Sequence, residues 1–247
     1  MRVTVIGSGD AFGSGGRFNT CFHVATTKCT VLVDCGASTM VALRAHGIDP
    51  NTIDAVILTH LHGDHFGGIP FLLLDAQYMS RRERPLTFAG PPGTRERITA
   101  ALEVFFTGSS KTKWRFPWSV TEIAVGEPTD VLGLTVMSAE VIHYSGAPST
   151  ALRLTDGAKT LAYSGDTEWT EALPPIASDA DLFIVECFDY ARDLSGHLNW
   201  TTVRERLPDF AAGLVMVTHM NPTMLARLDE VKAAGLLIAE DGLVVDL

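Results

Sequence analysis

The length, composition and charge of this chain exclude several classes of protein at the outset. Its 247 residues are 46% hydrophobic and 19% charged; this is typical of a globular protein with a substantial core, and no segment approaches the roughly 18 apolar residues of a membrane span. The net charge of −10 argues against an extended nucleic acid as partner, because proteins grip such partners through phosphate contacts on a basic face.

The N-terminus and the cysteines predict a cytoplasmic protein. The chain goes directly from Met1 into a strand pattern, without the basic segment, apolar segment and small-residue cleavage site of a secretory signal. The four cysteines (Cys21, Cys29, Cys35 and Cys187) form no Cys-x-x-Cys pair. We therefore expect them to be reduced thiols.

Strand patterns dominate the first part of the chain and later alternate with helical patterns. Up to residue 106, strands are predicted at 2–6, 23–26, 30–33, 54–58 and 86–89, and helices at 38–46, 67–79 and 92–106. Beyond it, strands are predicted at 135–143, 150–154, 161–164, 181–186 and 213–219, helices at 201–206 and 222–234, and a closing pair of strands at 236–247. No linker divides the chain, so we expect an α/β fold with two sheets and outer helices, in one domain spanning residues 1–247.

A run of histidines and an aspartate follows the buried strand at 54–58. It reads Thr59-His60-Leu61-His62-Gly63-Asp64-His65. Imidazole nitrogens and carboxylate oxygens are ligands of zinc, manganese or iron, and the run contains no cysteine that would favour a structural thiolate site. His60 and His62 can face one metal while Asp64 and His65 face another. The alternative is a polar turn, which three histidines within six positions disfavour.

Three more residues of metal-binding type are predicted at the ends of strands. His143 ends the strand pattern at 136–142, Asp166 follows the strand at 161–163, and His219 ends the strand at 214–217. Each residue alone is more often structural. Loops at the ends of neighbouring strands gather to form sites, however, so the three residues and the motif together predict two metal sites.

In these motifs the chain resembles the metallo-β-lactamase fold superfamily over nearly its whole length. The shared pattern is the His-x-His-x-Asp-His run followed by a lone His, a lone Asp and a final His, in that order. The resemblance implies an αββα four-layer sandwich and a hydrolase with two divalent metal ions, zinc before manganese or iron. By position it implies His60, His62 and His143 as ligands of the first metal, Asp64, His65 and His219 as ligands of the second, and Asp166 as the bridge.

Local sequence contexts favour the ribonuclease Z and phosphodiesterase branch of this superfamily. The third-ligand histidine stands in Val141-Ile142-His143-Tyr144 and not in the Thr-Pro-Gly-His context of glyoxalase II-like and lactonase-like members. The contexts that resemble the branch are Gly7-Ser8-Gly9, Asn19-Thr20, Asp34-Cys35-Gly36, residues 62–70, residues 89–93 and Ser164-Gly165-Asp166-Thr167.

Two further residues match a pair that members of this branch carry beside the metals. Glu186 ends a predicted strand, and His197 follows in Gly196-His197-Leu198. The resemblance implies that Glu186 orients His197, which protonates the leaving oxygen. The alternatives are a loop histidine near the helix at 201–206 and a buried, paired carboxylate.

One departure from ribonuclease Z bears on the substrate. That family inserts a long tRNA-clamping arm between the third-ligand histidine and the bridging aspartate, whereas His143 and Asp166 are only 23 positions apart here. Two strands and a turn fill this interval. With the acidic net charge, the short interval predicts a small or nucleotide-like phosphodiester as substrate and not pre-tRNA.

The resulting expectation is a phosphodiesterase that uses a metal-bridging hydroxide, with Asp64, Asp166, Glu186 and His197 as its catalytic residues. Asp34 and backbone carbonyls are candidate partners for the outer nitrogens of the ligand histidines. Three alternatives stay open: a carbonyl-ester hydrolase (lactonase, thioesterase or β-lactamase-like), a ribonuclease Z-type tRNA 3′-processing endonuclease, and a binding protein without hydrolytic activity.

Two clusters of basic residues lie outside these motifs. Lys111, Lys113, Trp114, Arg115, Phe116 and Trp118 interleave cations with rings, which can stack a base and hold phosphates. More often such a cluster packs its rings onto the domain or forms a homodimer contact. The run Arg81-Arg82-Glu83-Arg84 is expected to be an exposed turn.

Overall fold

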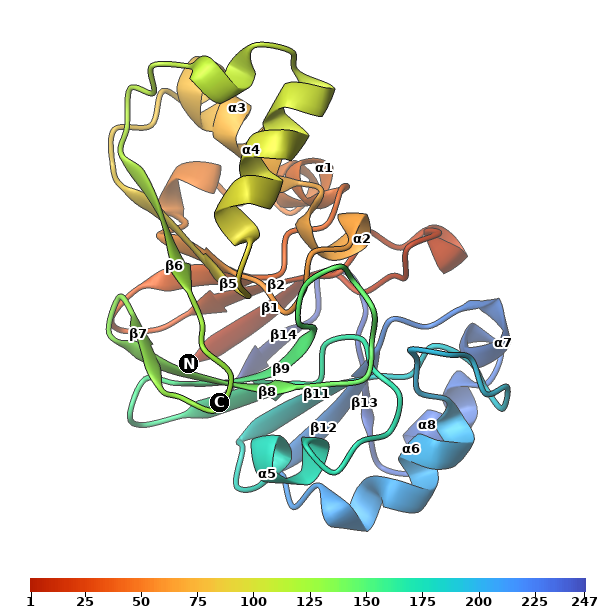
Figure 1. Cartoon of the computed structure of the whole chain (residues 1–247). Helices are drawn as coiled ribbons and strands as arrows, with labels where there is room; N and C mark the ends of the chain where they lie inside the picture. The colour runs from red at the N-terminus through yellow and green to blue at the C-terminus, as the bar shows by residue number, and fades with distance from the viewer.

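The chain folds into two sheets that pack face to face, with helices on both outer faces (Figure 1). The computed structural model describes residues 1–247. The N-terminal sheet has the strand order β14 (Val244–Asp246), β1 (Arg2–Gly7), β2 (Cys21–Ala25), β3 (Thr30–Val33), β4 (Ala55–Ile57), β5 (Leu86–Gly90) and β6 (Trp118–Glu122). The C-terminal sheet has the order β13 (Leu237–Ile238), β12 (Leu214–Thr218), β11 (Leu182–Glu186), β10 (Thr160–Tyr163), β9 (Thr150–Thr155), β8 (Leu134–Glu140) and β7 (Thr129–Val131).

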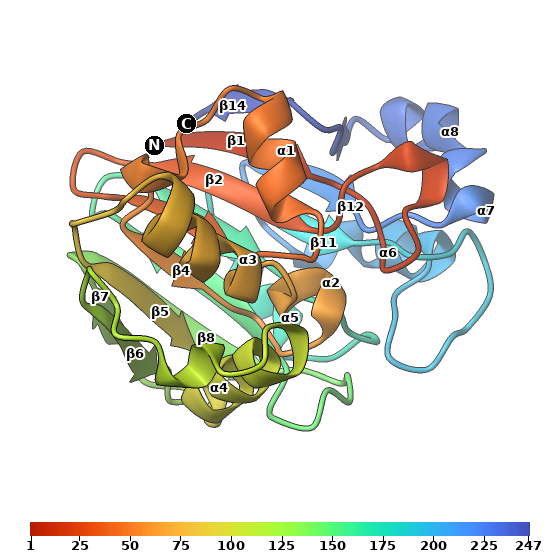
Figure 2. The same ribbon diagram turned by 90° about the horizontal axis from the view of Figure 1, so that it is seen from above.

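The view from above shows helices along the outside of the sheets (Figure 2). The N-terminal sheet is covered by α1 (Thr39–Ala45), α3 (Ile69–Leu74) and α4 (Thr94–Phe105), and the C-terminal sheet by α5 (Leu173–Ala177), α6 (Trp200–Arg206) and α8 (Leu228–Ala233). The remaining helical segments are α2 (Gly63–Phe66), α7 (Pro222–Leu225), the 3-10 turns η1 (Ser14–Gly16), η2 (Pro50–Thr52), η4 (Ser109–Lys111) and η5 (Leu207–Asp209), and the π-helical turn η3 (Asp75–Met79). The predicted α/β class and αββα four-layer sandwich are confirmed.

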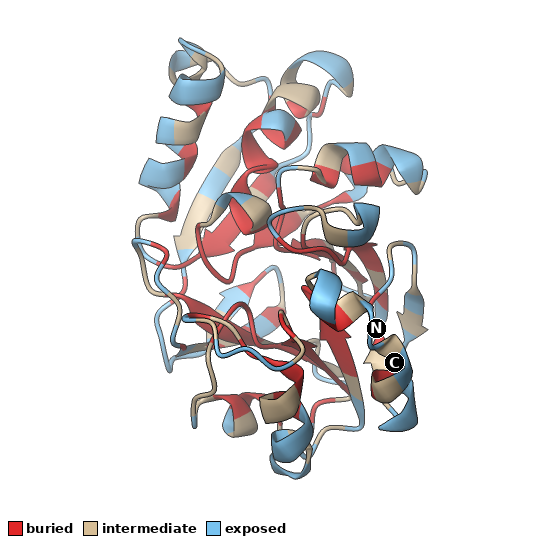
Figure 3. Ribbon diagram, turned by 90° about the vertical axis from the view of Figure 1, so that its right-hand side faces the viewer, coloured by how far each residue is buried: buried red, intermediate tan, exposed pale blue.

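The largest apolar cluster lies between the two sheets. It contains 22 buried residues, among them Val3 and Phe22 of the N-terminal sheet and Leu161 and Ile184 of the C-terminal sheet. Figure 3 shows the same distribution: buried residues lie on the strands and on the inner sides of the helices, and exposed residues on the outer sides. Burial of each such side chain stabilises the fold by roughly 1.5–3 kcal/mol, so this cluster fixes how the sheets sit on each other.

The direction of the strands determines which loops meet. β4 is parallel to β3 and β5, and β10, β11 and β12 are parallel to one another. β8 has the same direction as β10, because both are antiparallel to β9. Carboxyl ends of parallel strands open at one edge of a sheet, where α/β proteins build their sites. The loops after β8, β10, β11 and β12 therefore share one edge of the C-terminal sheet, and the residues that follow β4 meet them there.

Some predicted boundaries are wrong. The strand predicted at 135–143 ends at Glu140, because the chain leaves the sheet there and the amide of Ile142 donates to Thr167 Oγ1 (3.1 Å). The helix predicted at 222–234 is divided into α7 and α8, since Arg227 between them has a non-helical φ of −127°. The predicted closing strands lie in different sheets: β13 pairs with β12, and β14 pairs with β1.

Other features lie outside the predicted pattern. The strands β6 and β7 and the helix α5 were not expected from the sequence. Arg82, expected in an exposed turn, is only 2% exposed. Its guanidinium donates to the carbonyls of Ile53 (2.7 Å) and Pro85 (2.6 Å), so it binds together the loops that flank β4 and β5.

All four cysteines are buried and unpaired. The structure contains no helix that has both the length and the apolar character needed to cross a membrane.

The apolar cluster between the sheets can be tested with a matched pair of substitutions. Leu161→Ala removes a fully buried side chain in β10, and we expect it to lower the free energy of unfolding by about 2–5 kcal/mol. Leu214→Ala, at a position 42% exposed in β12, should change it by well under half as much. Urea denaturation of both variants measures the difference, and equal losses would contradict the position of this core.

Candidate metal centre

The loops at the shared edge bring every predicted site residue together. The seven predicted ligands form two groups in which the ligand-type atoms lie within 4.8 Å of one another: His60, His62 and His143 in the first, and Asp64, His65, Asp166 and His219 in the second. A third group of the same kind, formed by His143, Asp166 and His197, connects the first two.

A change of backbone conformation inside the motif divides its residues between the two groups. His62 is extended, with φ −75° and ψ 153°, and is the N-cap of α2. The helical turn begins at Gly63, where the amides of His65 (3.0 Å) and Phe66 (2.9 Å) donate to the carbonyl of His62. His60 and His62 therefore precede the turn and face the first group, while Asp64 and His65 rotate with the helix into the second.

The three rings of the first group converge. Their centroids lie 4.8–5.0 Å apart, and His143 Nε2 is 2.9 Å from His62 Nδ1. His60 Nε2 is buried and has no hydrogen-bond partner. A buried imidazole nitrogen is seldom left unpaired, and three nitrogens directed at one point fit a metal ion better than they fit one another.

Asp166 is at the centre of the second group. Its Oδ1 lies 3.2 Å from His65 Nε2, and its Oδ2 lies 3.3 Å from His219 Nε2. The contact with His65 lacks hydrogen-bond geometry, so both of its atoms are buried without a partner. Asp64 Oδ2 is 3.3 Å from the same His65 nitrogen. Two carboxylates and two imidazoles form a donor set that suits a divalent cation.

The electrostatics of this group favour positive charge. Burial alone would lower the pKa of His65, but Asp166, Asp64 and Asp34 outweigh it and hold that pKa well above its ordinary value. Burial alone would raise the pKa of Asp166, but His219 and His65 hold it well below its usual range. The carboxylates therefore remain anionic and attract a cation.

The outer nitrogens of four histidines are held by neighbouring groups, which leaves each Nε2 facing the site. His65 Nδ1 donates to Asp34 Oδ2 (2.7 Å), His143 Nδ1 donates to Gly196 O (2.8 Å), His60 Nδ1 lies 3.0 Å from Thr59 Oγ1, and His219 Nδ1 lies 3.2 Å from Thr20 Oγ1. Such outer contacts fix the tautomer and direction of a ligand histidine. Asp34 was expected in this role, whereas Thr20, Thr59 and Gly196 were not singled out.

Glu186 and His197 form a pair beside Asp166. His197 Nδ1 lies 3.1 Å from Glu186 Oε1 and 4.0 Å from Asp166 Oδ2. Burial raises the pKa of Glu186 to about 7. Burial would lower the pKa of His197, but the Glu186 carboxylate outweighs it and raises that pKa to about 9. His197 also stacks on Phe188, with ring centroids 4.7 Å apart, so its ring is held from two directions.

Comparison with known proteins agrees with this geometry. The family model described as "Anti-Pycsar protein Apyc1" matches residues 1–240. The chain belongs to the Anti-Pycsar protein Apyc1 family.

Two proteins with similar sequences are named as a metallo-hydrolase and a ribonuclease. The probable metallo-hydrolase YhfI of Bacillus subtilis (strain 168) is 27% identical over 228 residues, which cover 89% of this chain and 87% of that protein. Ribonuclease Z of Mycobacterium sp. (strain KMS) is 29% identical over 195 residues, which cover 74% of this chain and 67% of that protein.

Solved structures show the same fold. The crystal structure of YhfI superposes with a TM-score of 0.80 at 24% identity, covering 99% of both chains. A diphosphatase of the PhnP family superposes with a TM-score of 0.80 at 18% identity, covering 100% of this chain and 97% of the other. The predicted metallo-β-lactamase fold, with ribonuclease Z-like relatives, is confirmed, and this member of the Apyc1 family is a metal-dependent hydrolase.

Two residues of this Apyc1-family site have a strained backbone. Asp34 (φ 59°) and His219 (φ 61°) are in the left-handed region, which residues other than glycine seldom adopt. Local contacts hold both: Asp34 Oδ1 accepts from the amide of Thr59 (2.8 Å), and the amide of His219 donates to Ser8 O (3.2 Å). Strained residues cluster at functional sites, where the surrounding structure holds them in place.

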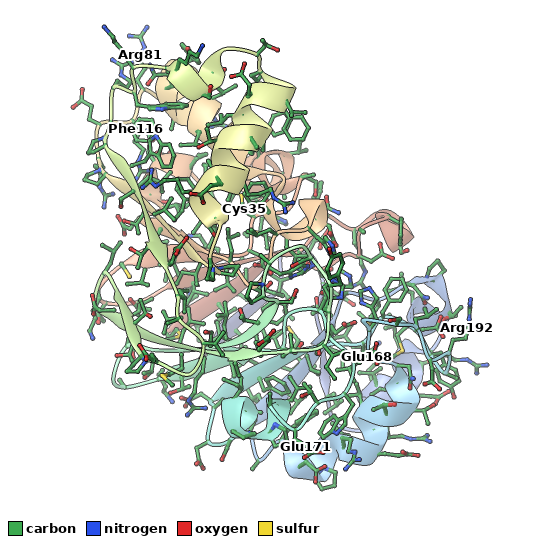
Figure 4. All side chains as sticks on the ribbon, in the orientation of Figure 1. Cys35, Arg81, Phe116, Glu168, Glu171 and Arg192 are labelled. Carbon is green, nitrogen blue, oxygen red and sulfur yellow. The ribbon has the colours of Figure 1, made fainter.

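The basic and aromatic cluster at 111–118 lies away from this site. Phe116 is 2% exposed, and Trp114 packs edge-on against both Phe116 (5.9 Å) and Trp118 (6.4 Å). Figure 4 places Phe116 among the helices of the N-terminal half, far from Glu168 of the C-terminal half. The rings pack onto the domain, which was the more frequent of the expected arrangements.

The contact between Asp34 and His65 predicts an effect on metal affinity. We expect Asp34→Ala to weaken zinc binding about 10–100-fold, because His65 loses the partner that directs its Nε2. Chelator competition on the metal-free protein measures this affinity. Asp246→Ala, which removes an exposed carboxylate paired with Arg2, is the control, and an equal affinity of the two variants would contradict the orienting role of Asp34.

Proposed function

We propose that this chain is a phosphodiesterase that hydrolyses a small or nucleotide-like phosphodiester with two divalent metal ions, and that both ions are zinc in preference to manganese or iron. The observation that carries the proposal is the pair of ligand groups that meet at Asp166, beside the Glu186–His197 pair. The proposal takes residues 1–247 as one hydrolase domain. The four buried, unpaired cysteines support a cytoplasmic location for it, because thiols stay reduced there.

The ligand roles follow the grouping of the side chains. His60, His62 and His143 would hold one ion, and Asp64, His65 and His219 the other. Asp166 would contact both ions, because it lies within reach of His143 of the first group as well as of His65 and His219 of the second. When bound, two such ions bring the pKa of a water molecule towards neutrality and neutralise charge on the phosphoryl oxygens.

The protein's own residues position the substrate and supply a proton. The Nδ1 of His197 is engaged by Glu186, so Nε2 is the atom that can deliver a proton to the leaving oxygen. Glu186 is fully buried and also accepts from the amide of Thr167 (2.6 Å). This second hydrogen bond keeps the carboxylate in place while the imidazole changes its protonation state.

The choice of substrate rests on the relatives and on the shape of this chain. A ribonuclease and a diphosphatase among the proteins it resembles favour phosphoester over carbonyl chemistry. Between His143 and Asp166 the chain forms only a loop, β9 and β10 with a short turn, so no arm extends from this interval to hold a tRNA. The net charge of −10 points to a substrate with few phosphates.

A substrate screen tests the reaction. We expect the zinc-loaded protein to hydrolyse bis-p-nitrophenyl phosphate, and prolonged chelation to reduce the rate at least 100-fold, because the ions supply the nucleophile. A lactone, a thioester, a cephalosporin and a pre-tRNA are assayed in parallel. Faster turnover of any of these would overturn the proposal in favour of the corresponding hydrolase.

Two substitutions separate metal binding from proton donation. His197→Ala should retain both metals and lower kcat about 10²–10⁴-fold for a poor leaving group, with a smaller loss for p-nitrophenolate, which leaves without a proton. Asp166→Ala should lose metal and turnover together. Metal analysis and kinetics measure both effects, with His23→Ala in β2, outside the metal centre, as the control; full activity of His197→Ala on the poor leaving group would remove the proton-donor role.

A further inference from the structure

Glu168 connects the two loops that carry His143 and His197. Its backbone amide donates to the carbonyl of Ile142 (3.1 Å), the residue before His143. Its side-chain Oε1 accepts from the amide of Gly196 (2.8 Å) and from Ser195 Oγ (3.2 Å), the two residues before His197. One residue therefore fixes the chain next to a candidate metal ligand and next to the candidate proton donor.

The loop that receives the Glu168 carboxylate is a tight turn. The amide of His197 donates to Leu194 O (3.1 Å), and Gly196 has φ +84°. A glycine with positive φ at the third of four positions is typical of a type II turn. The carbonyl of the same Gly196 accepts from His143 Nδ1 (2.8 Å), so the position of this residue directs the His143 ring.

Side-chain packing holds this turn from one side, where the His197 ring stacks on Phe188 and the adjoining Leu198 is buried. A cavity of about 460 Å³ lies against it, lined by Glu168, Trp169, Thr202 and all residues of the segment 193–199 except Gly196. Because the cavity borders the turn, few apolar contacts restrain it from that side, and hydrogen bonds must do so instead. The two bonds to Glu168 Oε1 are charge-assisted, which is the stronger class of hydrogen bond.

We propose that Glu168 is a positioning residue: its carboxylate holds the turn 194–197 so that Gly196 O orients His143 as a metal ligand and His197 meets the leaving group. This proposal rests on the proposed function, because it takes the roles of His143 and His197 from there. The Glu168 carboxylate contacts neither His143 nor His197 directly. It acts on both through Gly196.

Two variants of Glu168 separate the hydrogen bonds from the charge. Glu168→Ala removes the acceptor, and we expect zinc affinity and kcat each to fall about 10–100-fold, with KM within about threefold of the native value. Glu168→Gln keeps an oxygen that accepts from Gly196 and Ser195, and both quantities should recover to within about threefold. Chelator competition measures the zinc affinity, and steady-state kinetics measures kcat and KM. For Glu168→Ala we expect the loss of kcat to be larger on a substrate with a poor leaving group than on one with a good leaving group.

A neighbouring carboxylate supplies the control. Glu171 lies on the same loop and accepts from Trp169 Nε1 (3.1 Å); in Figure 4 it sits at the outer margin, while Glu168 lies nearer the site edge. Glu171→Ala should keep native affinity and kcat. Equal effects of the Glu168→Ala and Glu171→Ala variants, or native behaviour of Glu168→Ala, would overturn the positioning role.

A double-mutant cycle tests whether the effect passes through Gly196. Gly196→Ala places a Cβ 2.8 Å from His143 Nδ1 at a position with positive φ, so it should displace the same ring. If Glu168 acts through this glycine, the double variant should lose much less affinity than the product of the two single losses. Independent, multiplicative losses would contradict the route.

Hydrogen exchange in the metal-free protein keeps this test separate from the proposed function. The Gly196 amide should be protected in the native protein and in Glu168→Gln, and exposed in Glu168→Ala. If the native protein bound no zinc while this protection still depended on Glu168, the proposed function would fail and the contact would stand. Protection independent of Glu168, in a protein that binds zinc and cleaves the phosphodiester, would overturn only the positioning role.

Discussion

The packing of the two sheets on each other is the constraint on which the metal centre depends. The motif at 59–65 follows a strand of the N-terminal sheet, whereas His143, Asp166, His197 and His219 come from loops of the C-terminal sheet. The groups can meet only if the sheets keep one relative position, which the apolar cluster between them provides.

Hydrogen bonds at the site edge refine that position. The carbonyl of Thr59 accepts from the amide (3.1 Å) and the Oγ1 (2.9 Å) of Thr150, so the residue before His60 is bound directly to the start of β9. The carbonyl of Ser8, which directly follows β1 of the N-terminal sheet, accepts from the amide of His219. Apolar burial brings the sheets together, and these directional hydrogen bonds determine where the ligand residues of one sheet lie relative to those of the other.

Concentrating charge at this edge has a cost in stability. Asp34, Asp166 and Glu186 are each at most 2% exposed, and burying a carboxylate is unfavourable unless hydrogen bonds or cations compensate it. Asp34 and Glu186 are compensated by amides, a hydroxyl and histidines. Asp166 keeps a buried oxygen without a hydrogen-bond partner. The carboxylate that keeps an oxygen without a hydrogen-bond partner is therefore the one at which both ligand groups meet.

The sequence predicts the parts of this site that depend on local pattern. The motif at 59–65, and the placement of Asp166, Glu186 and His219 after or at the end of apolar strands, follow from residue type and hydrophobic run, and the structure agrees. His143 was placed at a strand end, but β8 stops at Glu140, because a tertiary bond to Thr167 draws the loop away from the sheet. A hydrogen bond between residues 25 positions apart cannot be predicted from the local sequence pattern.

The same reason explains why Glu168 and the strand β7 escaped prediction. Glu168 acts on Gly196, 28 positions away, and nothing in the residues around it differs from an ordinary polar loop. β7 is a three-residue edge strand, Thr129–Val131, with one buried side chain. An element this short forms because β8 offers it a partner, and the hydrophobic run that identifies a central strand is missing.

The hydrogen bonds around the site form two networks with different consequences. The Asp34 network, through Thr59, His60 and His65, lies within loops of the N-terminal sheet and acts on both ligand groups. The network of Glu168, Gly196 and Glu186 lies in the C-terminal sheet and its loops, and reaches the ring of His143 and that of His197. Changes in the second network can therefore alter the environment of the leaving group while the motif at 59–65 stays intact. Since His143 and His197 share the turn 194–197, the geometry of one ligand and the geometry of proton donation cannot vary independently in this fold.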